Sequence, residues 1–449
     1  MGIRVTPPRT RPIVNEALNT LIRQARWTRA AVAANVNAVA AEMGVKLSYD
    51  HSTVGHWLTG SVPLPAGICA ATEAFRRRLG RPDLTSADLG WPLVAIAAPG
   101  HDLWQGDPVD RLAALGEDDM LHRRTVLTAG ALALAELTAV PPPPDHPPAP
   151  RRGGSADVER VRASTRVFAD LDDLYGGGHA RAAVAAYLVS EVVPLLRGTR
   201  GRAQPQMFVA AGELTYLAAY MAADDGANGL AQRYYASTVR LADQAGDRVL
   251  RATALRSMAA QAAELGHVRQ SRDLADAAAA ALGAGGSART RAWVRAMQGE
   301  AQGGMGDRWA SLSLLRQAES LLERADSVPQ SEWTGNFRRE SLEHATALAL
   351  GKLGDDAGAA RHFSASMASR RSVERRTRAL IGARAAQAWL RAGEVDHAAA
   401  VALDLGSVQD IRSARVQQEV RRLRAAWQPY RRNAQVADAD RLLSAVPGR

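Results

Sequence analysis

Proline nearly disappears from this 449-residue chain after residue 155. The rest of the sequence contains only five prolines, at positions Pro194, Pro205, Pro329, Pro429 and Pro447. Apolar residues recur there at helical spacing, and no stretch alternates apolar and polar residues as a half-buried strand does. Alanine is abundant and aromatic residues make up only 5% of the chain, which favours helices that approach one another closely. This segment is therefore predicted to be entirely α-helical.

Short turn signals divide the helical segment at similar intervals. Gly266, Gly306, Gly354 and Gly393 each precede a polar residue, and they are 40, 48 and 39 residues apart. Each interval is long enough for one pair of helices. A single helical hairpin exposes an apolar face, so its neighbours are needed to bury it. We expect residues 155–449 to form helical hairpins stacked in series as an α-solenoid.

A proline-rich tract separates this segment from the rest of the chain. Residues 140–150 contain seven prolines, which force an extended conformation and exclude a helix. We place a linker at residues 140–154 and, before it, a connecting segment that begins at residue 96 and contains a helix near 120–139. Residues 13–95 are expected to form a separate domain, and the basic, proline-containing residues 1–12 a disordered arm.

Arg123 and Arg124 lie ahead of a moderately apolar run that Glu136 interrupts, a pattern similar to a twin-arginine export signal. Such signals work at an amino terminus, whereas this one follows a complete candidate domain. The run is also too short to span a bilayer. We interpret it as an internal helix, with export through these two arginines as the alternative.

Basic residues are concentrated in the first part of the chain. The net charge is +10, and residues 1–80 hold ten Lys and Arg against four Asp and Glu. This balance admits an anionic partner such as nucleic acid. Cys69 is the only cysteine, so no intrachain disulfide and no cysteine-rich metal site can form, which fits a reducing cytoplasm.

The stretch from Asp50 to Pro63 has the pattern of a short capped helix. Asp50 can accept a hydrogen bond from the first turn, and Gly60 and Pro63 end the helix. Three apolar residues share one face at i, i+3, i+4 spacing, namely Val54, Trp57 and Leu58. Four polar side chains project from the opposite side: Ser52, Thr53, His56 and Thr59. The pattern fits an ordinary amphipathic surface helix and equally a helix that reads a groove of DNA.

Together with the preceding Trp-Thr-Arg-Ala-Ala-Val-Ala at residues 27–33, this stretch resembles the helix-turn-helix of the phage-repressor-like (XRE) regulators. In that family a Trp-Ser/Thr-x-x-x-apolar-Ala segment forms the scaffold helix, and Ser-x-apolar-x-x-Trp-x-x-Gly-x-x-Pro forms the recognition helix. The resemblance covers residues 14–90. The chain departs from the pattern by an insertion of residues 35–49 between the two helices, and actinobacterial members with an elongated turn are similar in this respect.

The resemblance implies double-stranded DNA as a partner. The candidates for contacts with base edges are Ser52, Thr53, His56 and Thr59. Further DNA contacts are predicted for Arg26, Thr28, Arg29 and Lys46, and the three cations among them are expected to contact phosphates. Trp57 could read the groove, but the family pattern and its spacing from Val54 place it in the core. His51 and His56 are poorly spaced for one helix face, so no metal site is expected.

The hairpins of residues 155–449 resemble tetratricopeptide repeats, although their period exceeds the usual value of about 34 residues. Such repeats present a concave surface that holds a peptide, a helix or a small ligand. Aromatic residues are scarce here and asparagine can pair with a peptide backbone. We therefore predict that the lining includes Trp293, Trp333, Asn336, Phe337 and Arg338. The alternative for the two tryptophans is that they fill the core between hairpins.

No catalytic motif is recognisable: the sequence lacks His-Glu-x-x-His, a phosphate-binding glycine loop and Gly-x-Ser-x-Gly. We therefore expect neither enzymatic activity nor a cofactor. The features together predict a cytoplasmic, homodimeric transcription regulator that binds DNA, makes no membrane contact and binds a peptide, protein or small-molecule effector in its repeats. This architecture is similar to that of peptide-sensing regulators and of actinobacterial regulators of development and antibiotic production. The alternative is a repeat scaffold whose helix-turn-helix remnant binds protein in place of DNA.

Overall fold

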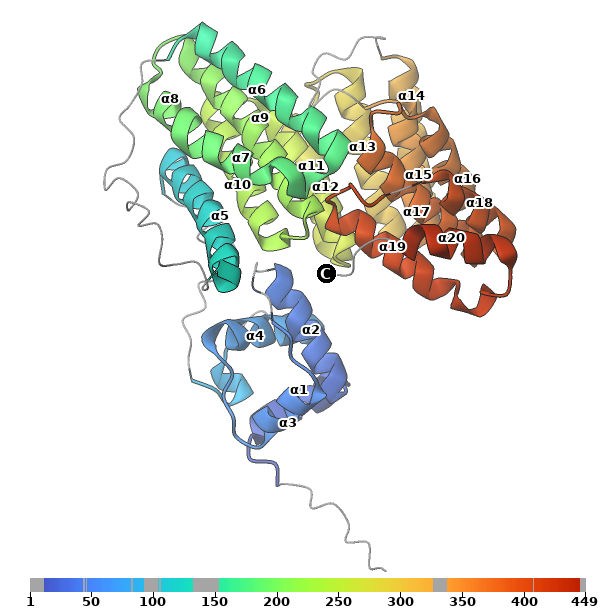
Figure 1. Ribbon diagram of the computed structural model, residues 1–449. Coiled ribbons are helices and arrows are strands. Elements are labelled where there is room, and N and C mark those ends of the chain that lie inside the picture. The colour runs from blue at the N-terminus through green and yellow to red at the C-terminus, as the bar shows by residue number, and fades with distance from the viewer. Residues whose placement is uncertain are drawn as a thin grey trace, which may run out of the picture. The chain divides into compact units, whose positions relative to one another are not determined.

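The structure is a computed structural model, and it describes residues 12–42, 45, 47–81, 84–92, 104, 106–131, 153–325, 337–406 and 408–444. Every regular element in these ranges is a helix, so the predicted all-α fold is confirmed (Figure 1). The chain divides into two compact units, one formed mainly by residues up to Leu103 and the other mainly by residues from Trp104 onward. They are called unit 1 and unit 2 below.

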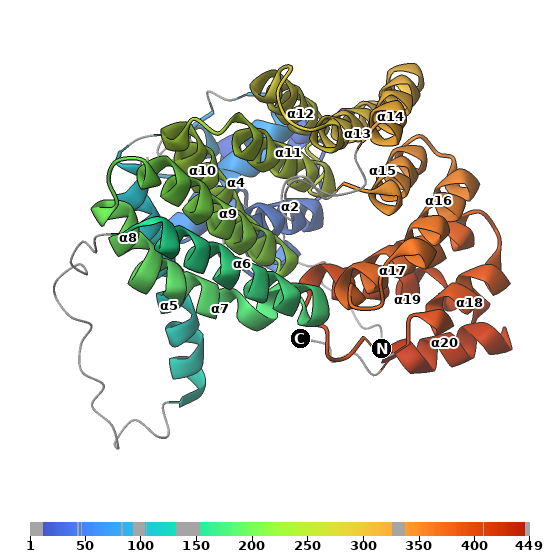
Figure 2. The same ribbon diagram turned by 90° about the horizontal axis from the view of Figure 1, so that it is seen from above.

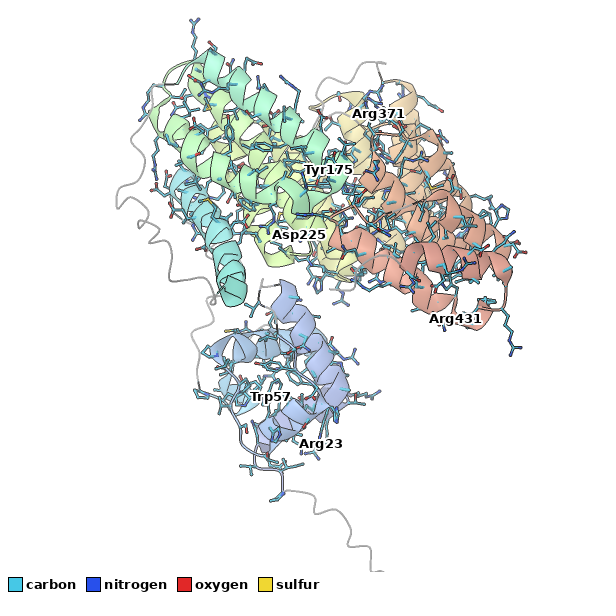
Figure 3. All side chains as sticks on the ribbon, in the orientation of Figure 1. Arg23, Trp57, Tyr175, Asp225, Arg371 and Arg431 are labelled. Carbon is cyan, nitrogen blue, oxygen red and sulfur yellow. The ribbon has the colours of Figure 1, made fainter. Side chains whose placement is uncertain are left out.

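Unit 1 is a set of short helices around one hydrophobic core. Its helices are α1 (Glu16–Ala25), α2 (Arg29–Glu42), α3 (His51–Leu58) and α4 (Pro65–Leu79), followed by the 3-10 turn η1 (Ala87–Leu89). The Trp57 ring meets Tyr49 and Trp91 edge-on, at centroid distances of 5.0 and 5.6 Å. Trp57 is only 3% exposed and lies among the helices of unit 1, whereas Arg23 lies at the outer edge (Figure 3). The prediction that Trp57 belongs to the core is confirmed.

Asn15 ties the start of α1 to two distant parts of unit 1. Its Oδ1 accepts a hydrogen bond from the Leu18 N–H and so caps α1. Its Nδ2 donates to the Leu89 carbonyl oxygen at 2.9 Å. The backbone N–H groups of Val14 and Asn15 both donate to the Leu58 carbonyl at the end of α3. These bonds fix α3 against α1.

The first helix of the predicted pair, expected to end where the insertion of residues 35–49 begins, continues to Glu42. Val36, Val39 and Ala40 are buried, so these positions extend the apolar face of α2. No glycine or proline occurs between Asn35 and Glu42 to stop the helix. Much of the insertion predicted at residues 35–49 is therefore an extension of α2, which corrects the expected helix end.

Unit 2 contains the remaining helices. They are α5 (Pro108–Ala131), α6 (Ser155–Tyr175), α7 (Gly177–Tyr187), η3 (Leu188–Val192), α8 (Val193–Gly198), α9 (Ala203–Asp224), α10 (Asn228–Ala245), α11 (Arg248–Glu264), α12 (Val268–Leu282), α13 (Ala288–Gly304), α14 (Arg308–Glu323), α15 (Arg339–Lys352), α16 (Asp356–Ser369), α17 (Arg375–Arg391), α18 (Val395–Asp404), α19 (Ala414–Ala426), η4 (Gln428–Tyr430) and α20 (Ala434–Ser444). Helix α5 begins inside the segment expected to connect the two domains and packs against α7 and α8. Asp107 caps it by accepting hydrogen bonds from the Val109 and Asp110 N–H groups. Residues 132–152, which include all but the last two residues of the linker predicted at residues 140–154, lie outside the described residues.

Successive helices of unit 2 pair as hairpins, α11 with α12, α13 with α14, α15 with α16 and α17 with α18. Each of these turns contains one of the four glycines singled out in the sequence, with φ between 81° and 88°. Glycine adopts such positive values without steric cost. Asp307 and Asp355 follow two of them and accept hydrogen bonds from the N–H groups of Ala310 and Gly358 in the next helix. The helices form the expected series of stacked hairpins and follow one another around a curve (Figure 2).

The last hairpins of unit 2 contact its first helices. Helix α6 packs against α17, and the Arg412 N–H, in the loop before α19, donates to the Tyr175 carbonyl oxygen at 2.6 Å. The Arg376 guanidinium of α17 lies 3.2 Å from the Asp172 carboxylate of α6 and 3.7 Å from the Asp224 carboxylate of α9. The solenoid is therefore closed on itself through charged side chains from both of its ends.

One stretch of unit 2, Gly177–Gly198, is long and apolar enough to cross a membrane by length and composition alone, and 56% of its most apolar window is buried inside the protein. Val184, Leu188 and Leu195 are each at most 1% exposed. The stretch contains the π-helical turn η3 just before Pro194. Proline lacks a backbone N–H and interrupts the α-helical hydrogen-bond ladder, which accounts for a local π-turn. Burial against neighbouring helices explains the apolar composition of this stretch.

Candidate functional site

Helix α3 starts with a reciprocal cap. Asp50 Oδ1 accepts hydrogen bonds from the backbone N–H and from the hydroxyl of Thr53, both at 2.8 Å. Thr53 Oγ1 accepts in turn from the Asp50 N–H at 3.5 Å. The hydrogen bonds from Thr53 hold the pKa of the Asp50 carboxyl below its usual range. The Asp50 carboxylate is thus hydrogen-bonded to the first turn of α3. Thr53, which was predicted to face DNA, takes part in this helix cap.

The two faces of α3 differ as predicted. Val54, Trp57 and Leu58 are buried. Ser52 and His56 are exposed, and Thr59 is half-buried at the end of the helix. The Thr59 hydroxyl donates to the His56 carbonyl oxygen at 3.0 Å, so part of its hydrogen-bonding capacity is used locally. Among the base-facing candidates, Ser52 and His56 are therefore the side chains best placed to reach an external partner.

A surface hollow of about 330 Å³ runs along the exposed face of α3. It is lined by Ile13, Arg29, His51, Ser52, Gly55, His56, Leu58 and Thr59, a set without a carboxylate. Arg29, the first residue of α2, places its Nη1 3.5 Å from the position that a Cβ on Gly55 would occupy. Glycine in the middle of α3 thus gives the Arg29 guanidinium room to lie against this helix. Four of the predicted DNA-contact residues, Arg29, Ser52, His56 and Thr59, meet in this hollow.

The other predicted DNA contacts lie around α2 or cannot be placed. Thr28 caps α2 by accepting a hydrogen bond from the Ala31 N–H at 3.1 Å, and its side chain is exposed. Arg26 is exposed and ends α1 in a left-handed conformation with a φ of 53°. Lys46 lies outside the described residues. The amino-terminal end of a helix attracts anions, so the start of α2 with Arg29 suits a phosphate.

Asn37 is a positioning residue that the sequence pattern did not indicate. From α2 its Nδ2 donates to the Tyr49 carbonyl oxygen at 2.8 Å, and its Oδ1 accepts from the Tyr49 N–H at 2.9 Å. This pair of bonds holds the chain just ahead of α3 against α2. One feature of the sequence could have indicated this role: Asn37 lies within an otherwise apolar helical stretch. Asparagine has a low helix propensity and favours hydrogen bonds to nearby backbone groups, so its presence there suggests such a bond.

The arginine run at the end of α4 is largely structural. Arg76 Nε donates to the Leu84 carbonyl oxygen at 2.6 Å, and Arg78 Nε donates to the Ala25 carbonyl oxygen at 3.0 Å. The Arg78 guanidinium also lies over the Trp27 ring, 6.0 Å from its centroid. Basic charge in unit 1 is therefore not all available to a partner, and Arg29 is the arginine that borders the hollow along α3.

A second candidate site is the interior of unit 2. A cavity of about 340 Å³ lies between the inner helices, and its lining includes Trp293 and Phe337, two of the predicted effector contacts. Arg338 is the N-terminal cap residue of α15 and is not part of this lining. Trp333 and Asn336 lie outside the described residues. Phe337 is 4% exposed and packs in the core, so it supports the cavity wall more than it faces a ligand.

Charged and aromatic side chains make this interior unlike an ordinary helical core. Burial raises the pKa of Glu264, but the guanidinium groups of Arg415 and Arg384 outweigh it and hold that pKa at about 2. Burial and the nearby arginines Arg384 and Arg370 lower the pKa of His344 well below its usual value. Arg384 Nη1 lies 3.3 Å from His344 Nε2 and can only donate. His344 is therefore neutral at physiological pH, with its proton on Nδ1.

Metal binding has no support in the described part of the chain, where no group of three or more His, Cys, Asp and Glu could hold an ion. Cys69 is half-buried, and burial raises the pKa of its thiol.

Residues 18–92 match the family model described as the SP15 N-terminal domain. The matched range runs from within α1 to just beyond η1, so it coincides with the folded helices of unit 1. Comparisons with curated proteins and with solved structures found no match.

Proposed function

We propose that this protein is a sequence-specific DNA-binding regulator, in which unit 1 binds double-stranded DNA through α3 and unit 2 receives an effector. The observation that carries the DNA-binding half is the hollow along α3. Exposed hydrogen-bonding groups of Ser52 and His56 lie there beside the Arg29 guanidinium, without a lining carboxylate. A surface with donors, acceptors and positive charge suits the polar, anionic grooves of DNA.

The size of α3 supports a major-groove contact. Its 8 residues span about 12 Å at 1.5 Å per residue, a length comparable to the width of the major groove. In this arrangement the first turn presents Ser52, and His56 follows one turn later on the same face. The start of α2, with Arg29, would meet a flanking phosphate. This division of roles gives base contacts to α3 and phosphate contacts to α2.

The effector half of the proposal is supported by the interior cavity of unit 2. Its volume of about 340 Å³ falls at the lower end of the range of ligand pockets, which suits a small molecule or a few residues of a peptide. The remaining parts of the proposal are a homodimer, a cytoplasmic location, tetratricopeptide-like ligand reception and no catalytic activity. Regulation then requires the effector to bind the DNA-binding and non-binding conformations with different affinity.

Fluorescence anisotropy with a labelled mixed-sequence duplex tests DNA binding by the full-length protein. We expect salt-sensitive binding by the wild type, and Arg29→Gln should weaken it and reduce the salt slope by about 0.9 if Arg29 neutralises one phosphate. Arg441→Gln is the matched control, because Arg441 is an exposed arginine of unit 2 whose side chain is 79% accessible. Circular dichroism should show the same helical content for all three proteins.

In vitro selection from a random duplex pool separates base reading from phosphate contact. His56→Ala should relax the selected sequence at particular positions, whereas Arg29→Gln should lower affinity for all duplexes alike. Absence of duplex binding by the wild type at low salt would refute the DNA-binding half. Salt-insensitive retention of a protein partner with no DNA binding would favour a repeat scaffold.

A further inference from the structure

The carboxylates and the arginines that line the interior cavity of unit 2 differ in how completely they are paired with opposite charges. Every carboxylate of the lining has a cationic partner: Asp172 and Asp173 meet Arg376, Glu264 meets Arg384 and Arg415, Glu300 meets Lys352, and Glu374 meets Arg370 and Arg371. Among the four arginines of the lining, Arg370, Arg376 and Arg415 belong to these pairs. Within the described residues, the fourth, Arg256, has no carboxylate partner. The described part of the cavity lining therefore contains one cation without a counter-charge.

Arg256 is held in place by an aromatic ring. Its guanidinium lies over the ring of Trp293, 4.7 Å from the centroid. Its Nε is buried and has no hydrogen-bond acceptor in the described structure. Stacking occupies the face of the guanidinium and leaves its in-plane N–H groups free to donate. A buried donor without an acceptor costs free energy, and a ligand that supplies an acceptor recovers it.

The groups around Arg256 also favour an acceptor. His344 is neutral and carries its proton on Nδ1, because its Nε2 faces a guanidinium group. The Tyr216 hydroxyl shares a hydrogen bond of 2.9 Å with Ser257 Oγ, one residue after Arg256. The positive charge of Arg256 lowers the pKa values of Tyr216 and Tyr235, opposing the rise that burial causes. The charge of Arg256 therefore acts on neighbouring side chains of the cavity lining.

Apolar surface completes the lining. Trp293 of α13 and Leu348 of α15 border the cavity together with Leu217 of α9. A ligand that is only ionic would leave this surface in contact with water. A ligand with an apolar body and one anionic group would satisfy both parts of the lining.

We propose that the interior of unit 2 binds a small organic anion, whose carboxylate or phosphate oxygens pair with Arg256 and whose apolar body lies against Trp293 and Leu348. This inference rests on the second half of the proposed function, the reception of an effector by unit 2. Two parallel N–H···O bonds from one guanidinium match the geometry of both anions. Loss of one such charge-assisted contact weakens binding about ten- to a hundredfold.

The test compares ligands of one shape that differ in charge. 3-Phenylpropionate, its neutral amide 3-phenylpropionamide and 2-phenylethyl phosphate are titrated into full-length protein by isothermal calorimetry, without DNA. We expect one or both acids to bind with at least about tenfold higher affinity than the amide. A preference between the two acids identifies the anionic group as carboxylate or phosphate.

Substitutions then assign the selectivity to Arg256. Arg256→Gln should abolish the preference for acid over amide while leaving amide binding unchanged, and Arg256→Lys, which keeps the charge but loses the planar fork, should give an intermediate preference. Arg251→Gln is the control on the same helix, because Arg251 pairs with Asp243 and its side chain is 41% exposed. Thermal unfolding of each variant verifies folding.

Three results would overturn the inference: no saturable binding of either acid at millimolar concentration, equal affinity of acid and amide, or full acid selectivity in folded Arg256→Gln. DNA binding is read in a separate assay. If the protein prefers the acids but does not bind DNA, only the DNA-binding half of the proposed function is refuted. If it binds DNA but shows no preference for the acids, only this inference is refuted.

Discussion

Replacement of Asp172 by asparagine should remove a pH dependence from the stability of unit 2. Asp172 is 3% exposed on α6 and faces Asp173 on the same helix, Asp224 on α9, Arg376 on α17 and Arg415 on α19. Burial raises the pKa of the Asp172 carboxyl to about 7, because the attraction of Arg376 offsets only part of the burial cost and the two neighbouring carboxylates add to it.

The sign and size of the effect follow from proton linkage. Between the ordinary aspartate pKa near 4 and the folded value of about 7, the folded state holds a proton that the unfolded state has released. Stability therefore falls as the pH rises through this window. Each pH unit is worth about 1.4 kcal/mol well below the folded pKa and less close to it, so the free energy of unfolding should drop by about 2 kcal/mol between about pH 5 and pH 7.

Urea unfolding followed by circular dichroism at several pH values measures this slope. Asparagine resembles the protonated acid, so Asp172→Asn should match the wild type near pH 5 and exceed its stability near pH 8 by about 2–3 kcal/mol. Asp438→Asn is the control, since Asp438 is exposed on α20 and, within the described residues, forms an ion pair with Arg441. Parallel pH profiles for the wild type and Asp172→Asn would refute the reasoning.

Two further pairs of substitutions test packing and positioning. Gly177→Ala should destabilise unit 2 by about 1–3 kcal/mol, because the new Cβ would press on the backbone of Met221, whose Cα would lie 2.7 Å away. Gly351→Ala, whose Cβ would meet Ala359 at an ordinary 3.7 Å, should stabilise α15 by up to about 1 kcal/mol; calorimetric melting temperatures that move together would contradict this contrast. Asn37→Ala should cost about 2 kcal/mol through two lost hydrogen bonds to Tyr49 and weaken DNA binding. Asn35→Ala, at an exposed site on the same helix, should leave DNA binding unchanged and should not lower stability, because alanine is the better helix former; equal losses for both asparagines would argue against the positioning role of Asn37.

The parts of the fold that local pattern determines were predictable. Val54, Trp57 and Leu58 are buried because their spacing places them on one face of a helix, and a single face is all that this short helix can bury. Gly306-Asp307 and Gly354-Asp355 act as turns because glycine takes the positive φ and aspartate caps the next helix. Each of these features depends on residues within a few positions of one another.

The features that local pattern missed depend on distant partners. The end of α2 at Glu42 is set by burial of Val36 and Val39 against other helices, which overrides the weak helix propensity of asparagine at positions 35 and 37. Arg256 gives no signal in sequence, because its significance comes from Trp293 on the next hairpin and from carboxylates that are all paired elsewhere. The effector contacts were predicted mainly from aromatic residues, because these are rare in this part of the chain. This criterion identified Trp293 but not Arg256, which is stacked on it.

The residues that close unit 2 also line its cavity. Asp172 and Arg376 join α6 to α17, and both belong to the cavity wall. Opening the closure would separate the wall into two parts, so we expect a ligand that contacts both parts to bind the closed arrangement more tightly. A ligand that binds only the closed arrangement would, at a concentration one hundredfold above its Kd, favour closure by about 2.7 kcal/mol. Asp172 belongs both to the closure and to the cavity wall, so occupancy of the cavity and the protonation of Asp172 act on the same arrangement and should influence each other. The free energies of the two processes are similar in size. An effector with this differential affinity meets the thermodynamic requirement for regulation, whereas a ligand indifferent to closure does not.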